Sequence, residues 1–230
     1  LLGKGGMGEV WRCHDAHLGR ELALKTSTAS DPESQLRFAR EARVQGQLEH
    51  PAIVPVYDIG TRDDGSPFFT MKRVRGTTLE AIIEQLAAGN PEACSKYTQR
   101  RLLSAFLSVC FAVEYAHERG VLHRDLKPAN VMLGDLGEVY VLDWGLAKVE
   151  GTADEELASA ISSEPSGPRH ETRDGEIMGT PGYMPPEQLR GEFKNLDRRA
   201  DVYSLGVILF ETLALTPLHG RGNLQAIMAS

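Results

Sequence analysis

The residues best suited to chemistry stand in two short stretches near the middle of the chain. Residues 123–130 read HRDLKPAN, and residues 143–145 read DWG. Together they supply two carboxylates, one amide and one ammonium group, on Asp125, Asp143, Asn130 and Lys127. Carboxylate and amide oxygens are ligands that Mg²⁺ prefers, whereas soft metals prefer sulfur. The two stretches therefore predict a site for Mg²⁺ and phosphate.

A predicted β-hairpin brings these stretches together. The apolar run 131–133 is followed by a turn-prone Gly/Asp segment and then by a second β-rich run, 139–142. Two such runs around a short turn are typical of a hairpin. Because a hairpin joins its two ends, we expect Asp125 and Asn130 to lie beside Asp143 at one end of a small sheet.

A glycine-rich stretch opens the chain, where residues 3–10 read GKGGMGEV. Glycines let a backbone turn lie close over phosphates with its N–H groups pointing inward. A Rossmann dinucleotide loop is the obvious rival, but it requires a helix directly after the glycines. Here residues 10–13 continue as a strand and a second strand is expected at 21–25, so a hairpin over phosphates fits better. Taken alone, the stretch is equally compatible with a glycine-rich turn that binds nothing.

Composition narrows the class of protein. The chain has 230 residues, 41% of them hydrophobic, which allows one large core or two lobes that share a cleft. The net charge of −7 argues against general binding of nucleic acid. Three cysteines without C-x-x-C spacing suggest neither a disulfide framework nor a zinc site, and they favour a reducing cytoplasm. No apolar run has the roughly 18 residues of a membrane span, and no signal peptide is recognised.

Helical patterns account for much of the remaining chain. We expect helices at 34–48, 79–88, 100–118 and 223–229, a loop at 89–97, and a buried helix that Asp201 opens and that includes 205–215. The pattern at 100–118 is apolar almost all round, which predicts that this helix is buried. Because the chain begins with Leu1 and stops inside an expected helix, we expect it to be part of a longer protein.

Six motifs occur in an order and with spacings similar to those of the protein kinases. They are the glycine-rich loop, A-x-K at 23–25, a helix glutamate at Glu41, HRDLKPAN, DWG, and GTPGYMPPE at 179–187. The chain resembles the bacterial branch of the eukaryotic-like serine/threonine protein kinases. The resemblance implies a two-lobed α+β fold. Residues 1–74 would form an N-lobe of antiparallel sheet plus one helix, and residues 75–230 a mainly helical C-lobe that lacks its last helices.

The resemblance also implies the roles of the residues in the central motifs. Asp125 would accept the proton of the substrate hydroxyl, and Lys127 would neutralise charge on the γ-phosphate. Thr180 would bridge Asp125 and Lys127, and Asn130 and Asp143 would hold Mg²⁺, with Mn²⁺ as an alternative. Lysine at 127 and threonine at 180 are features of the Ser/Thr kinases.

Two charged residues of the N-terminal part have implied roles at the phosphates. Lys25 would contact the α- and β-phosphates of ATP and pair with Glu41. Glu41 could equally pair with its own neighbours, because three arginines lie nearby in sequence, at 37, 40 and 43. Gln45, one turn after Glu41, departs from the apolar residue that many kinases carry there, which puts the rigidity of the active arrangement in question.

The remaining implied contacts are with the nucleotide. Met71 would be the gatekeeper at the end of a strand over 68–71, the Val74 backbone would bind adenine, and Thr78 would lie near the ribose. The full set of implied ATP contacts is Gly3, Lys4, Gly5, Gly6, Met7, Gly8, Val10, Ala23, Lys25, Met71, Val74, Thr78 and Met132.

One position and one segment distinguish this chain within the family pattern. Trp144 replaces the phenylalanine of DFG, and because it keeps a large aromatic group we expect adjusted packing with activity retained. Residues 152–173, rich in Ser, Thr, Glu, Pro and Gly, are expected to be a mobile activation segment. Our hypothesis is that Thr172 is its autophosphorylation site.

The expected activity is transfer of the γ-phosphoryl group of ATP to Ser/Thr hydroxyls of proteins in bacterial signalling. Protein substrates and self-association for autophosphorylation are the implied partners, without nucleic acid and without a membrane segment. One alternative is a small-molecule kinase of similar fold, against which the GTPGYMPPE stretch argues. The other is a module that binds nucleotide and signals by its shape.

Overall fold

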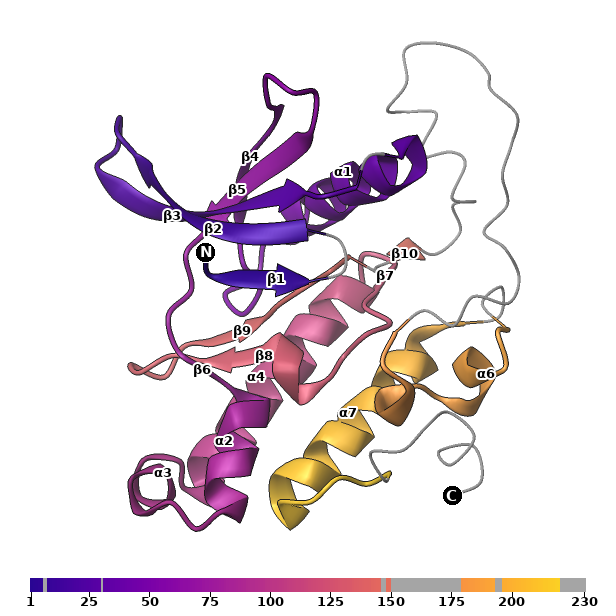
Figure 1. Ribbon diagram of the computed structural model, residues 1–230. Coiled ribbons are helices and arrows are strands. Elements are labelled where there is room, and N and C mark those ends of the chain that lie inside the picture. The colour runs from indigo at the N-terminus through magenta and orange to yellow at the C-terminus, as the bar shows by residue number, and fades with distance from the viewer. Residues whose placement is uncertain (6–7, 30, 146–147, 150–178, 193–195, 220–230) are drawn as a thin grey trace.

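A computed structural model describes residues 1–5, 8–29, 31–145, 148–149, 179–192 and 196–219. Strands β1 to β5 form one sheet in an upper lobe with helix α1, and the other helices lie in a lower lobe together with two small sheets (Figure 1). The predicted two-lobed α+β fold is confirmed. No helix in the described part of the chain is long and apolar enough to cross a membrane.

The upper lobe is a five-stranded antiparallel sheet in the order β1-β2-β3-β5-β4. Its strands are β1 (Gly3–Gly5), β2 (Gly8–Asp15), β3 (Arg20–Ser27), β4 (Val56–Thr61) and β5 (Pro67–Lys72). The predicted boundary between the lobes, after residue 74, falls in the segment between β5 and the next strand, and it stays a prediction.

Helix α1 (Pro32–Gly46) packs on β4 and β5 and carries Glu41. It begins where Asp31 accepts a hydrogen bond from the Ser34 N–H at 2.8 Å, and Pro32 occupies the first turn. The helix therefore starts and ends two residues earlier than predicted. Phe38 and Val44 of this helix are buried, and the Phe38 ring lies 5.1 Å from that of Phe69 in the sheet.

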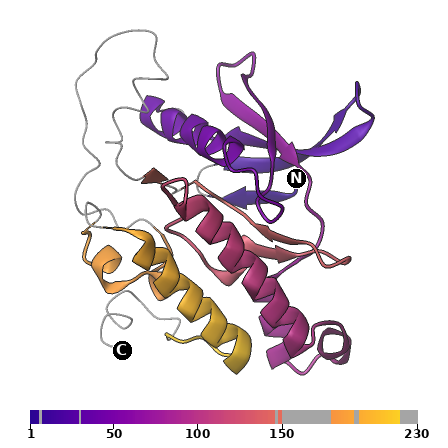
Figure 2. The ribbon, with the colours of Figure 1, turned by 180° about the vertical axis from the view of Figure 1, so that it is seen from behind.

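The lower lobe contains α2 (Leu79–Ala87), α3 (Pro91–Lys96), α4 (Gln99–His117), α6 (Pro186–Leu189) and α7 (Arg198–Ala214). Figures 1 and 2 show α4 and α7 side by side. The loop predicted at 89–97 is wrong, since it contains α3. Asn90 caps that helix by accepting from the Ala93 N–H at 3.0 Å, and Pro91 follows in the first turn. The helix predicted at 223–229 lies outside the described residues.

Two small sheets complete the lower lobe. One has the order β6-β8-β9, with β6 (Thr77–Thr78), β8 (Val131–Leu133) and β9 (Val139–Val141). The other pairs β7 (Val121–Leu122) with β10 (Lys148–Val149). Both lie next to the motifs that the sequence singles out.

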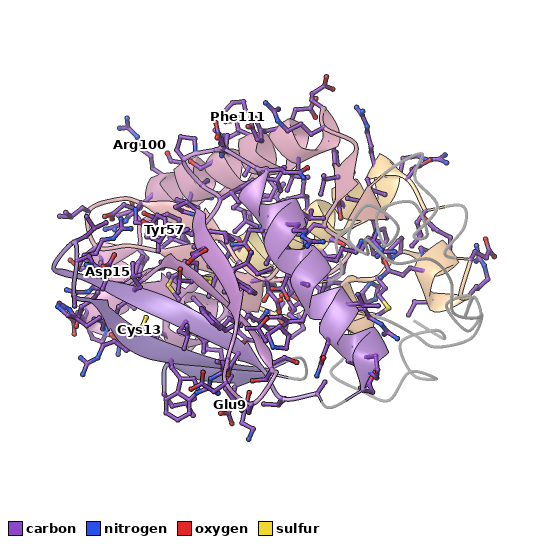
Figure 3. The ribbon with its side chains drawn as sticks, turned by 90° about the horizontal axis from the view of Figure 1, so that it is seen from above. Glu9, Cys13, Asp15, Tyr57, Arg100 and Phe111 are labelled. Atoms are coloured by element: carbon purple, nitrogen blue, oxygen red, sulfur yellow. The ribbon has the colours of Figure 1, made fainter. Side chains whose placement is uncertain are left out.

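Helix α4 buries only part of its apolar surface. Leu102, Val109 and Val113 belong to the main core, whereas Leu107 and Phe111 are 56% and 64% exposed. The prediction that α4 is buried all round is therefore wrong for the described residues. Seen from above, Phe111 and Arg100 lie on α4 at the opposite side of the molecule from Glu9 and Cys13 on β2 (Figure 3).

Gly76, just before β6, lies so close to the backbone of β8 that there is no room for a side chain. A Cβ atom there would lie 2.3 Å from the carbonyl oxygen of Leu133 in β8. Gly76→Ala should therefore lower the free energy of unfolding by about 1–3 kcal/mol, measured by denaturant titration.

Gly206 is a matched control, because it lies inside α7 and a Cβ atom added there would meet nothing within 4 Å. Gly206→Ala should raise the free energy of unfolding by about 0.5–1 kcal/mol. Equal stability of Gly76→Ala and the wild type would contradict the close approach.

Candidate active site

The predicted hairpin is present and brings the two central motifs to one end of a sheet. Strands β8 and β9 pair antiparallel, with Val131 opposite Val141. Just beyond the paired residues, the Leu142 N–H donates to the carbonyl oxygen of Asn130 at 2.8 Å. Asn130 and Asp143 are therefore held close together by backbone pairing.

Asp125, Lys127 and Thr180 form a closed triangle of polar contacts. The Lys127 ammonium donates to Asp125 at 2.8 Å and to the Thr180 hydroxyl at 2.7 Å. The Thr180 hydroxyl donates to the other carboxylate oxygen of Asp125 at 2.8 Å. Thr180 follows Lys127 by 53 positions and Asp125 by 55, so the fold holds it against the HRDLKPAN stretch.

Asn130 extends this cluster toward Asp143. Its Nδ2 donates to the Asp125 carbonyl oxygen at 2.9 Å and lies 3.4 Å from the Asp125 carboxylate. With the nitrogen used in this way, the amide oxygen is the group of Asn130 suited to a cation. The backbone of Asp143 is left-handed, with a φ of 59°.

Lys25 of β3 lies in an ion pair with Glu41 of α1. The Lys25 ammonium is 2.5 Å from one Glu41 oxygen and 3.5 Å from Asp143, and the side chains of Lys25 and Glu41 are 12% and 1% exposed. Burial alone would lower the pKa of Lys25, but the carboxylates of Glu41 and Asp143 outweigh it and raise that pKa. Lys25 is therefore a buried cation that two acids keep protonated.

The pKa values of the two acids beside Lys25, Glu41 and Asp143, shift in opposite directions. Burial raises the pKa of Glu41, and the attraction of Lys25 opposes this rise without cancelling it. Partial burial would also raise the pKa of Asp143, but Lys25, His123 and Lys127 lower it. Asp143 is therefore ionised at neutral pH and suited to a cation.

The donor set fits Mg²⁺. In the described part of the chain no three His, Cys, Asp or Glu side chains gather as a metal site. Mg²⁺ is commonly bound by one or two carboxylates together with substrate phosphates, and not by an all-protein cage. Asp143 and Asn130 supply oxygen ligands of this kind next to Lys25.

Asp201, near the start of α7, anchors the backbone of the HRDLKPAN stretch. Its fully buried carboxylate accepts hydrogen bonds from the His123 and Arg124 N–H groups at 2.9 and 2.8 Å, and lies 2.8 Å from His117 Nε2. Burial would raise the pKa of Asp201, but the hydrogen bonds with His117 and with the His123 and Arg124 N–H groups outweigh it and lower that pKa. Asp201, which was expected to open a buried helix, thus also connects α7 to α4 and to the HRDLKPAN stretch.

Trp144 is packed in the main core of the protein. Its side chain is fully buried, and its ring lies 4.7 Å from that of His123. The indole Nε1 has no hydrogen-bond partner among the described residues. His123 in turn lies 3.1 Å from the carbonyl oxygen of Leu142, which directly precedes the DWG stretch, so its ring contacts both Trp144 and the backbone that leads to Asp143.

The predicted nucleotide contacts fall into two groups. In the sheet, Val10 pairs with Lys25 and Ala23 pairs with Met71 across neighbouring strands. The other implied sheet residues that are described, Gly3, Lys4, Gly5 and Gly8, lie in the β1–β2 hairpin.

In the lower lobe, Thr78 pairs with Met132 between β6 and β8. Val74 lies in the segment that links β5 to β6. The Thr78 hydroxyl also caps α2 by accepting from the Ala81 N–H at 3.2 Å, which gives Thr78 a structural role besides the predicted one. Gly6, Met7 and the proposed phosphorylation site Thr172 lie outside the described residues.

Sequence comparison agrees with this geometry. Residues 1–229 match the family model described as the protein kinase domain, and the chain belongs to this family. It is 40% identical over 232 positions to serine/threonine-protein kinase PknD of Protochlamydia amoebophila, covering 97% of this chain and 23% of the relative.

Two further relatives are similarly close. Serine/threonine-protein kinase PknD of Chlamydia pneumoniae is 39% identical, covering 94% of this chain and 24% of the relative. A probable serine/threonine-protein kinase of Streptomyces coelicolor is 40% identical, covering 94% and 30%. The chain thus spans about a quarter to a third of the length of these relatives.

Removing the charge of Asp201 should loosen the backbone of the HRDLKPAN stretch. Asp201→Asn leaves buried donors around a weaker acceptor, so the free energy of unfolding should fall by about 3 kcal/mol at neutral pH. Because folding lowers the pKa of Asp201, its contribution is complete above the pKa of the unfolded aspartate, 3.8, and is lost as the pH falls below it. Denaturant titrations at several pH values measure both effects.

Asp197→Asn is the control, since Asp197 caps the same helix at the surface and asparagine caps equally well. It should change stability by less than about 0.5 kcal/mol. Equal effects of the two substitutions would show that Asp201 is no special anchor.

Proposed function

We propose that this domain transfers the γ-phosphoryl group of ATP to serine and threonine hydroxyls of proteins. The observation that carries the proposal is the contact triangle of Asp125, Lys127 and Thr180, with Asn130 attached to it. Such a set combines a base, a cation and an oxygen ligand within one hydrogen-bonded cluster. Phosphoryl transfer needs mainly positioning and charge neutralisation, which is what this cluster offers.

Each group has a defined task in the proposed reaction. Asp125 accepts the proton of the substrate hydroxyl and orients its oxygen toward the phosphorus. Lys127, held between Asp125 and Thr180, presents its ammonium to the charge that develops on the transferred group. Lys25, fixed by Glu41, binds the α- and β-phosphates. Mg²⁺, when bound, neutralises the β- and γ-phosphates.

Asn130 and Asp143 are the residues that would hold the metal ion, and the ATP contacts implied by the family pattern supply the rest of the nucleotide site. The lowered pKa of Asp143 supports its part, because an ionised carboxylate is the stronger ligand.

The proposal extends to partners and location. Protein substrates are favoured by the GTPGYMPPE stretch, which the family uses to dock peptides. Autophosphorylation, with Thr172 as the predicted acceptor, would require two copies of the chain to meet. We assign the domain to the cytoplasm, in agreement with its three free cysteines, Cys13, Cys94 and Cys110.

The direct test is transfer of labelled γ-phosphate from ATP and Mg²⁺ to a generic protein substrate. The wild type should incorporate label on Ser and Thr, and Asp125→Asn should reduce incorporation by at least about a hundredfold because the base is lost. Asp135→Asn is a matched control at an exposed turn, where the Asp135 carboxylate forms a surface ion pair with Lys96 at 2.7 Å. It should retain full activity.

A nucleotide-binding module would give a different outcome. It would bind ATP in the wild type and in Asp125→Asn alike, without incorporating label. Label on small molecules but not on protein would support the small-molecule kinase instead.

A further inference from the structure

Gln45 is a buried amide in the helix that carries Glu41. It lies one turn after Glu41 on α1, and its side chain is among the buried polar groups, with an exposed fraction of 3%. Its Nε2 donates to the backbone carbonyl oxygen of Val54 at 2.8 Å. Residues four apart on a helix share one face, so Glu41 and Gln45 both point into the protein from the same side.

Val54 belongs to a buried segment that is fixed to the lower lobe. Val54 itself is 2% exposed. Within the same segment, the Ala52 carbonyl oxygen accepts from the Val141 N–H at 2.7 Å, and Ile53 forms a parallel bridge with Val141. Val141 ends β9 two residues before Asp143. The Gln45 bond therefore ties α1 to the same segment that holds the strand leading to Asp143.

The two elements that this segment joins, α1 and β9, each bring an acid to Lys25. Glu41 contacts the Lys25 ammonium at 2.5 Å from the α1 side, and Asp143 approaches it at 3.5 Å from the β9 side. A rotation or outward shift of α1 would move Glu41 away from Lys25 and would also break the Gln45 bond. The apolar contacts of α1 are non-directional, whereas a hydrogen bond fixes the helix in one rotation.

From these contacts we propose that Gln45 is a positioning residue of the phosphotransfer site. Its amide holds α1 in the rotation that keeps Glu41 on Lys25, and it does so by a bond to the segment that also positions Asp143. This inference rests on the proposed function. Loss of the Gln45 donor leaves the Val54 carbonyl oxygen buried without a hydrogen bond, which is unfavourable. A displacement of α1 that admits water to this oxygen relieves the penalty.

The test uses Gln45→Met, which keeps the size of the side chain and removes the donor. We expect kcat/KM for ATP to fall about tenfold, with a rise in KM, because Lys25 loses its fixed partner. In a Glu41→Gln background, the same substitution should lower kcat/KM for ATP by less than twofold, since Gln45 acts through Glu41. Phosphotransfer kinetics and calorimetric ATP affinity give the four values of this cycle.

Gln35 provides a matched control on the same helix. Its Nε2 also donates to a backbone carbonyl, that of Ala29 at 3.3 Å, but Ala29 precedes α1 and is not part of the segment bound to β9. Gln35→Met should therefore leave kcat/KM within twofold of the wild type. An equal loss in both variants would overturn the specific role of Gln45.

The remaining outcomes are also decisive. If Gln45 had a purely structural role, Gln45→Met would lower the amount of folded enzyme and leave KM unchanged. The loss of kcat/KM would then be the same in the wild-type and Glu41→Gln backgrounds. Gln45→Glu, which keeps the shape but offers a carboxylate to the Val54 carbonyl, should show the same loss as Gln45→Met, and unfolding of both would overturn the proposal. An inactive wild type would count against the proposed function, whereas an active wild type with unaffected Gln45 variants would count against this inference alone.

Discussion

A single buried cation determines how the upper part of this site is built. The ammonium of Lys25 is largely removed from water, and a buried charge is tolerated only when opposite charges compensate it. Glu41 and Asp143 do so from different parts of the chain, one from α1 and one from the residues after β9. The packing of α1 on the sheet and the pairing of the β8–β9 hairpin are the means by which these two acids reach the same lysine.

The lower lobe contains a buried anion whose charge is likewise compensated by its neighbours. Asp201 has no accessible surface, and two backbone N–H groups and a histidine satisfy it. Because those N–H groups belong to His123 and Arg124, compensation of the charge also fixes the backbone that leads to Asp125. The domain thus places the polar groups of the candidate site by satisfying two buried charges, one in each lobe. The indole nitrogen of Trp144, which has no partner among the described residues, is an exception to this pattern.

Local sequence signals were enough for much of this arrangement. The Gly/Asp turn predicted the β8–β9 hairpin, and the helical pattern at 34–48 predicted both ends of α1 to within two residues. The exposed face of α4 and the partner of Gln45 were not predictable in the same way. Both depend on which surfaces meet after folding, and the local sequence of an apolar helix or of a single glutamine does not indicate which residues it will contact. Helix α3 was missed because six residues carry too little periodicity. The roles of individual site residues stay predictions.

The most direct measurement is a crystal structure of the domain with Mg²⁺ and a non-hydrolysable ATP analogue. If Lys25, Asn130 and Asp143 form one nucleotide site, the α- and β-phosphates will lie within hydrogen-bond distance of the Lys25 ammonium. Asn130 and Asp143 will then coordinate the metal ion, with the γ-phosphate facing Asp125. A nucleotide bound elsewhere, or a metal ion without Asn130 and Asp143 among its ligands, would contradict this account of the site.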